Sequence, residues 1–79
     1  MPAVKHMNSR CHRALMAALA DARKQAKMSQ REVSARLKRP VNFSHLVESG
    51  QRGLNVCEFI DYVKAVRADP VQVLRKIVS

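Results

Sequence analysis

The stretch MSQREVSARLKRPVNFSHLVESGQR, residues 28–52, decides the fold of this chain, because it holds two short helical patterns separated by a tight turn. Ser29 and Glu32 form an S-x-x-E capping box, in which the serine accepts a hydrogen bond from an amide of the first turn and the glutamate reaches back to the serine amide. A helix is therefore predicted to begin at Gln30, with Ser34 left on the side that faces solvent or a ligand.

A second helix is predicted to follow the proline of this stretch. Pro40 has no amide donor and biases the preceding residue away from helical angles, but a proline suits the first position of a new helix. We therefore expect the first helix to stop before Pro40 and the second to cover about residues 41–49, with Gly50 as a left-handed cap. Helices this short cannot bury a core alone, so the pattern predicts a helix-turn-helix supported by flanking helices.

The flanking segments carry helical patterns of their own. The predicted N-caps are Ser9, Asn55 and Asp69. The helices that they open are expected over about residues 10–27, 56–67 and 70–78. The apolar residues expected to face the core are Leu15, Met16, Leu19, Ala22, Ala26, Met28, Val33, Leu37, Val56, Phe59, Ile60, Val63 and Val66. With no strand alternation and no repeat, the sequence predicts an all-α, five-helix fold.

Length and charge limit the further possibilities. A chain of 79 residues is one small domain near the lower limit for an independent core, and we expect this domain over residues 9–79, after a flexible N-terminal arm of residues 1–8. The formal net charge is +9. The basic residues between positions 23 and 52 are Arg23, Lys24, Lys27, Arg31, Arg36, Lys38, Arg39 and Arg52. Because this excess coincides with the helix-turn-helix pattern, it favours phosphate contacts over an ordinary solvated helix face.

Other classes of protein receive little support. No apolar run approaches the roughly 18 residues of a membrane span, and residues 1–10 lack the apolar middle of a secretory signal, so we expect a cytoplasmic, nucleoid-associated protein without membrane contact. Cys11 and Cys57 are expected to stay reduced. His6, Cys11 and His12 could seed a metal site, but their spacing does not support one.

Catalysis is also disfavoured by the sequence. The acidic residues form no recognisable metal-binding pair, and no glycine-rich phosphate loop is present. These acids are Asp21, Glu32, Glu48, Glu58, Asp61 and Asp69. We therefore expect neither an enzyme nor a cofactor.

The pattern of residues at the helix ends of this chain resembles that of the XRE family of bacterial and phage regulators, which includes the lambda and 434 repressors and Cro. The resemblance is carried by Arg23, by Ser29-Gln30 at a helix start, by Leu37, and by Val47-Glu48-x-Gly50 at the end of the second short helix, and it covers about residues 15–74. It implies a lambda-repressor-like DNA-binding domain and an ion pair between Arg23 and Glu48.

The chain departs from the family pattern at two places. Ser44 stands where the family commonly has an aliphatic core residue, so we expect Phe43 and Val47, four residues apart, to do the packing. Lys38 stands where the turn often has a glycine.

The resemblance also implies which side chains contact double-stranded DNA. Residues near the start of the recognition helix reach the floor of the major groove. Transferred position by position, the base-contacting residues are Val41, Asn42, Ser44 and His45. The residues expected to hold the phosphate backbone are Gln30, Arg31, Lys38, Arg39 and Arg52.

From this resemblance we expect a transcriptional repressor acting as a homodimer on a palindromic operator. Control of its own promoter is one role that the resemblance implies. The last helix is apolar over much of its circumference, which suggests a dimer interface. The interface residues would be Val71, Val73, Leu74, Ile77 and Val78. Packing of Val73 inside the monomer is the alternative. A second functional reading is the DNA-binding antitoxin of a toxin-antitoxin pair, which would also bind a toxin or other small protein.

Overall fold

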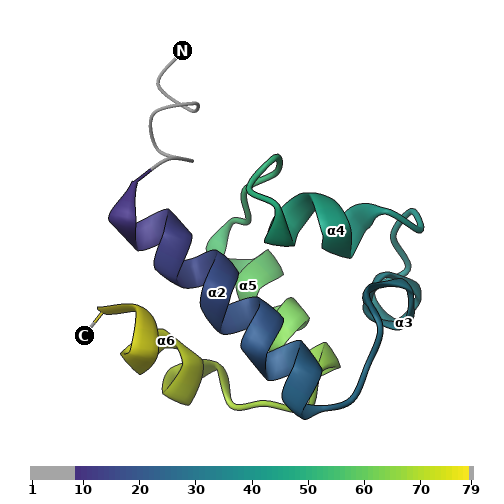
Figure 1. Cartoon of the computed structure of the whole chain (residues 1–79). Coiled ribbons are helices and arrows are strands. Elements are labelled where there is room, and N and C mark those ends of the chain that lie inside the picture. The colour runs from purple at the N-terminus through teal and green to yellow at the C-terminus, as the bar shows by residue number, and fades with distance from the viewer. Residues whose placement is uncertain (1–8, 79) are drawn as a thin grey trace.

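Five helices account for the secondary structure of residues 9–78, which are the residues described by the computed structural model (Figure 1). They are α2 (Arg10–Gln25), α3 (Gln30–Arg36), α4 (Phe43–Glu48), α5 (Val56–Ala65) and α6 (Pro70–Val78). The expected all-α, five-helix fold is confirmed for this range. The arm expected over residues 1–8 lies outside the described residues.

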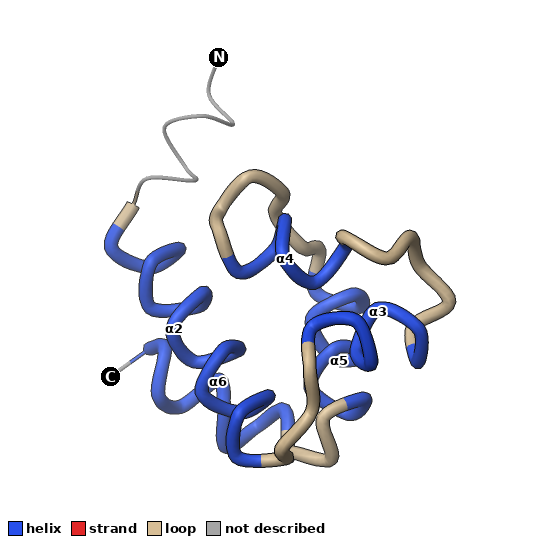
Figure 2. The backbone as a smooth tube through the Cα atoms, turned by 45° about the vertical axis from the view of Figure 1, so that its right-hand side comes forward, coloured by secondary structure: helices blue, strands red, loops and turns tan. Residues whose placement is uncertain are grey.

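The longest helix, α2, organises the arrangement of the others. Helix α6 packs along α2 and also contacts α5, whereas α3 and α4 pack against each other on another side of α2 (Figure 1). The tube view shows α3 and α4 joined by a short irregular turn, with α5 close to α3 (Figure 2). The helix-turn-helix is thus supported by flanking helices, as the sequence predicts.

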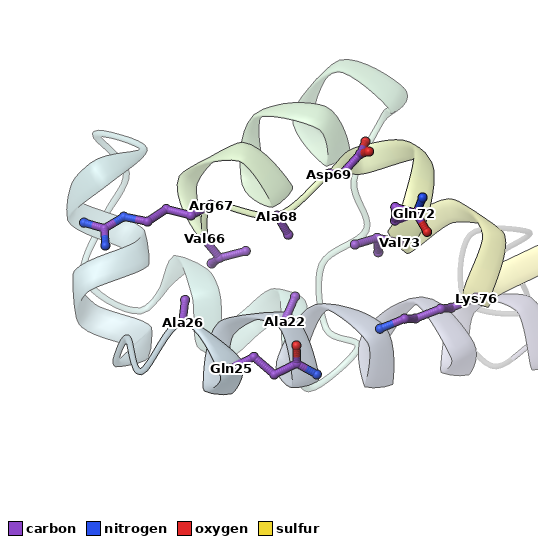
Figure 3. Close-up of a pocket in the computed structure, with 10 residues that line it drawn as sticks. All are labelled: Ala22, Gln25, Ala26, Val66, Arg67, Ala68, Asp69, Gln72, Val73 and Lys76. Atoms are coloured by element: carbon purple, nitrogen blue, oxygen red, sulfur yellow. The ribbon is translucent and has the colours of Figure 1, made fainter.

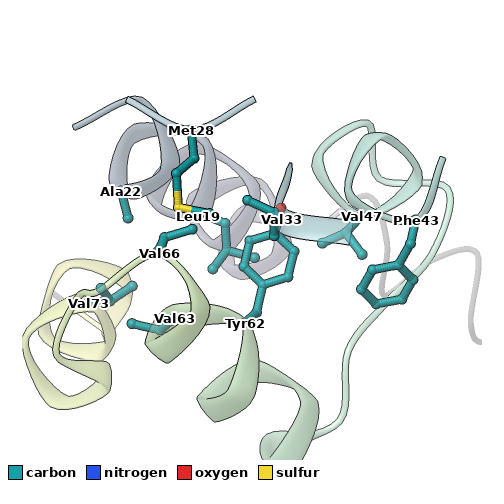
Figure 4. Close-up of a cluster of buried hydrophobic side chains, with 10 residues drawn as sticks. All are labelled: Leu19, Ala22, Met28, Val33, Phe43, Val47, Tyr62, Val63, Val66 and Val73. Carbon is teal, nitrogen blue, oxygen red and sulfur yellow. The ribbon is translucent and has the colours of Figure 1, made fainter. Parts of the chain in front are cut away.

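The core gathers where α2, α3, α4, α5 and α6 meet (Figure 4). Its buried members are Leu19, Ala22, Met28, Val33, Phe43, Val47, Tyr62, Val63, Val66 and Val73. Phe43 and Val47 both lie in this cluster, which confirms that they provide the packing face of α4. Tyr62 is fully buried and was not expected there.

The buried face of α5 differs from the predicted one at its first turn. Val56 was expected to face the core, but it is 73% exposed, whereas Tyr62, Val63 and Val66 are buried. Val56 instead borders an apolar surface groove together with Leu54, because the core lies beneath the C-terminal half of α5. The predicted inward position of Val56 is therefore wrong.

The recognition helix α4 begins later than predicted. The Phe43 amide donates to the Pro40 carbonyl over 2.9 Å, so Pro40 belongs to a turn rather than to the first turn of the helix. Asn42 occupies the N-cap position, and its side chain makes no capping hydrogen bond. The polar end of Asn42 is therefore not needed by the helix.

Four helices end in the same left-handed closure. Lys27, Lys38, Gly50 and Arg67 have φ values of 58°, 55°, 83° and 60°, and in each case the amide of the next residue donates to the carbonyl five positions before it. Only one of these closures uses glycine. Helices α2 and α5 end two residues earlier than predicted. Their ends were not recognised in the sequence because the left-handed residues there are Lys27 and Arg67 instead of glycine.

Helix α6 covers the range predicted from Asp69 and Pro70, but one of its faces was assigned wrongly. Val73 is only 4% exposed and belongs to the core, so it cannot belong to a dimer interface. The alternative reading, that it packs inside the monomer, is correct. Val71, Leu74 and Val78 remain 57%, 48% and 73% exposed.

Replacing Gly50 by alanine should destabilise the domain by about 1 to 2 kcal/mol, because its positive φ is strained for any L side chain. An added Cβ would also lie 2.7 Å from Met16 Sδ, so the methionine must move. Chemical denaturation measures the loss. Gly53→Ala is the matched control, since φ at Gly53 is not positive, and an equal loss at both glycines would contradict this explanation.

Candidate nucleic-acid interface

The recognition helix α4 presents one polar face to solvent. Asn42 and His45 are exposed, Val41 just before the helix is 60% exposed, and the opposite side is buried in the core. Three of the four expected base-contacting residues therefore lie on one accessible surface. Side chains with donor, acceptor and methyl-contacting groups are thus displayed at the beginning of the helix.

Ser44, the fourth expected base-contacting residue, is fully buried, so that expectation is wrong. Its hydroxyl is hydrogen-bonded to the hydroxyl of Tyr62, and its amide donates to Ser34 Oγ over 3.0 Å. Ser34 is also fully buried, although the helical pattern placed it toward solvent. The two serines form a polar link that holds the start of α4 against α3.

The carboxylate of Glu48 lies at the centre of a hydrogen-bond network beneath the interface. Arg23 donates from Nε to Oε2 over 2.7 Å and from Nη2 to Oε1 over 3.1 Å. Gln30 Nε2 donates to Oε1 over 3.0 Å, and the Tyr62 hydroxyl donates to Oε2 over 3.1 Å. The ion pair between Arg23 and Glu48 that the family resemblance implies is present. The whole network connects α4 to α2, α3 and α5.

Burial and hydrogen bonding act in opposite directions on the charge of Glu48. Burial favours the neutral acid, but the hydrogen bonds from Arg23, Gln30 and Tyr62 hold the pKa of Glu48 below its usual range. The bond to Glu48 raises the pKa of Arg23, and burial raises the pKa of the Tyr62 phenol. All three groups therefore keep the protonation states that the network needs.

The expected phosphate-contacting residues fall into two groups. Arg31 and Lys38 are exposed, and neither forms an ion pair within residues 9–78. Gln30 is half-buried because Glu48 holds one end of its amide. Gln30 and Arg31 lie in the first turn of α3, and Lys38 lies in the turn that follows this helix and leads to α4.

Arg39 and Arg52 are held in a second ionic cluster instead of extending freely. Arg39 Nη2 lies 2.8 Å and Arg52 Nη2 lies 2.9 Å from the same Glu58 oxygen, Oε2. Their guanidinium carbons lie 4.8 Å and 4.9 Å from the centre of the Phe43 ring, within cation–π range. The hydrogen bond from Arg52, followed by that from the Asn55 amide, lowers the pKa of Glu58 to about 2.

A groove of about 560 Å³ lies between α2, the turn after α5, and α6 (Figure 3). Ala22, Ala26 and Val73 contribute to its apolar floor, and the lining includes no residue of α3 or α4. Asp69 at its edge accepts a hydrogen bond from the Val71 amide over 2.9 Å, so its carboxylate caps α6. This groove is separate from the exposed face of α4.

A second groove, of about 360 Å³, is lined almost entirely by apolar side chains. Its residues are Cys11, Leu15, Leu54, Asn55, Val56, Phe59, Ile60, Pro70, Val71, Leu74 and Ile77. None of them is charged. We call this surface the apolar groove.

No group of three His, Cys, Asp or Glu side chains between residues 9 and 78 could hold a metal ion. His6, one member of the weak metal pattern, lies outside that range. No helix there is both long and apolar enough to span a membrane.

Comparison with known proteins places this geometry in a family. No family model matches the sequence, and no curated protein sequence matches it. Among solved structures, the chain is similar to an XRE-family like protein from Pseudomonas syringae pv. tomato str. DC3000, with 35% sequence identity and a TM-score of 0.84. The match covers 99% of this chain and 95% of the other.

Mutation of Arg23 and Glu48 to alanine, singly and together, should reveal a coupling free energy of about 1 to 3 kcal/mol in unfolding experiments. The pair is largely shielded from water, with 13% and 8% of the two side chains exposed. Asp21 and Lys76 provide the control, because their 3.9 Å pair is 56% and 60% exposed and should couple little. Equal coupling in both cycles would contradict a special role for Glu48.

Proposed function

The chain belongs to the XRE family of DNA-binding regulators, and on that basis we propose that it is a sequence-specific transcriptional repressor that binds a palindromic operator as a homodimer. The single observation that supports DNA reading best is the division of α4 into a buried face and an exposed polar face. Phe43 and Val47 fix the helix from below, while Asn42 and His45 stay accessible. Residues 9–79 would act as one DNA-binding domain.

In this proposal the exposed start of α4 enters the major groove. Asn42 makes a bidentate contact with adenine, Val41 contacts a thymine methyl group, and His45 donates to guanine or to a phosphate. The free side chain of Asn42 supports the first assignment, since the helix does not use it as a cap. Ser44 makes no base contact in this scheme.

The flanking basic residues bind the phosphate backbone. Arg31 and Lys38 supply exposed charges that form no ion pair with the other described residues, and Gln30 presents an amide already oriented by Glu48. Arg39 and Arg52 contribute less, because each shares its charge with Glu58. The backbone contacts therefore differ in how much affinity each of them adds.

The apolar groove is the surface that we propose for dimerisation. It extends the interface expected from Val71, Leu74, Ile77 and Val78 across to α5 and the start of α2. Two-fold pairing there would set two recognition helices roughly 34 Å apart, which is one turn of DNA. The same uncharged surface also suits a protein toxin, so an antitoxin is the second candidate function.

Binding to duplex DNA should weaken steeply as salt rises, because phosphate contacts release counterions. Asn42→Ala should cost roughly 1 to 3 kcal/mol of discrimination at defined base positions. Arg31→Ala should weaken all sequences about equally, and it is a cleaner control than Arg52→Ala, which would also break the ion pair with Glu58. Binding to a selected library before and after each change measures both effects, and identical sequence profiles for the two variants would contradict the assignment.

A charge introduced into the apolar groove should produce a monomer. Leu74→Glu places a carboxylate on a residue that is 48% exposed and lines the groove, so sedimentation should show loss of the dimer and much weaker operator binding. Gln72→Glu adds the same charge on the same helix, outside the apolar groove, and should leave the dimer intact. A wild-type chain that is monomeric at high concentration and co-purifies with a small protein would favour the antitoxin instead.

A further inference from the structure

The cluster of Arg39, Arg52, Glu58 and Phe43 joins the DNA-facing turns to the core. Phe43 is the first residue of α4 and is 5% exposed, and both guanidinium groups lie against its ring. The guanidinium groups converge on Glu58, which lies on α5 and has only 18% of its side chain exposed. One carboxylate therefore fixes two cations beside the start of the recognition helix.

These two arginines stay within reach of an anion while they are paired. Their side chains are 39% and 36% exposed, and neither pair closes off the guanidinium from solvent. The local charge is nevertheless reduced from two positive charges to one by the carboxylate. A phosphate approaching Arg39 or Arg52 would meet a cation that is partly neutralised, and would also meet the negative charge of Glu58.

Neutralisation of this kind acts mainly on nonspecific binding. Affinity for DNA of any sequence comes from the number of phosphates that cationic side chains neutralise, whereas base contacts add the sequence-dependent part. Within residues 9–78, the hydrogen bonds of Glu58 to Arg39 and Arg52 involve neither Asn42 nor His45, the base-contacting residues proposed above. A carboxylate that weakens two backbone contacts therefore leaves base reading intact.

We propose that Glu58 is a specificity-determining residue, which limits nonspecific DNA binding by holding Arg39 and Arg52 partly neutralised against Phe43. This inference rests on the proposed function, because it concerns the same DNA-binding surface. Glu58 acts through the two arginines and does not itself contact DNA. It also caps α5, since its carboxylate accepts from the Asn55 amide over 3.1 Å.

The test uses the full chain and a random-sequence DNA duplex as the probe, with affinity measured across a range of salt concentrations. Glu58→Gln should bind about tenfold more tightly near 0.1 M salt, and its salt dependence should steepen by about 0.9 for each phosphate contact that is released. Glutamine can replace glutamate in the capping box, so the fold should persist. The specificity ratio, measured against a site selected from a library, should fall.

The matched control is Asp61→Asn, on the same helix. It changes net charge equally, but Asp61 is exposed and forms no ion pair among the described residues. Its effect should be less than about twofold, because Asp61 lines a small pocket with Arg39 but forms no ion pair with it, and an exposed charge is weakened by salt. Equal effects of the two variants, an unchanged salt dependence for Glu58→Gln, or weaker binding by that variant would each overturn the proposal.

A second comparison does not depend on the folding of a Glu58 variant. Arg39→Gln and Arg31→Gln remove the same charge, but only Arg39 is paired with Glu58. The salt dependence of DNA binding should therefore decrease clearly less in Arg39→Gln than in Arg31→Gln. An equal decrease in the two variants would overturn the proposal. If the wild-type chain binds the random duplex without any salt dependence, the proposed function itself fails, and this outcome is separate from failure of the Glu58 inference.

Discussion

The buried carboxylate of Glu48 is the constraint on which the position of the recognition helix depends. A negative charge at the C-terminal end of a helix is unfavourable by itself, because that end already carries partial negative charge. The charge is stable here only because Arg23, Gln30 and Tyr62 donate to it from three other helices. With its six residues, α4 has little stability of its own. Its orientation is therefore set by this network and by the packing of Phe43 and Val47.

Local signals predicted the fold well where a side chain acts on its own backbone. The caps at Ser9, Ser29 and Asn55 each accept the expected amide, and α6 begins at Pro70. Helix ends were harder to predict, because three of the four left-handed closures use lysine or arginine where glycine would be the usual signal. Basic side chains are favourable near helix C-termini, so these positions gain electrostatically what they lose in backbone strain.

Long-range pairing explains the errors at the candidate site. Sequence alone identified which residues are basic, but not that Glu58 would hold Arg39 and Arg52 on the ring of Phe43. The burial of Ser44 could not be read from its own helix, because its partner Tyr62 lies 18 positions away on α5. The paired phenol and hydroxyl replace the aliphatic contact expected there, since both side chains are fully buried and the hydrogen bond between them satisfies their polar groups. The Arg23–Glu48 pair, by contrast, was accessible through family resemblance.

The distribution of charge over the molecule bears on how two copies could meet. Each chain has a formal net charge of +9, so two copies repel one another over distances comparable to the Debye length of about 10 Å at 0.1 M salt. Close approach is least unfavourable where a surface carries no charge of its own, and the apolar groove has no charged lining residue. Helix α6 makes this possible because it turns Val73 into the core and leaves Val71 and Leu74 exposed beside the groove. Bound DNA would reduce the repulsion further, since phosphates neutralise the basic faces. Pairing and operator binding should therefore reinforce one another in this chain.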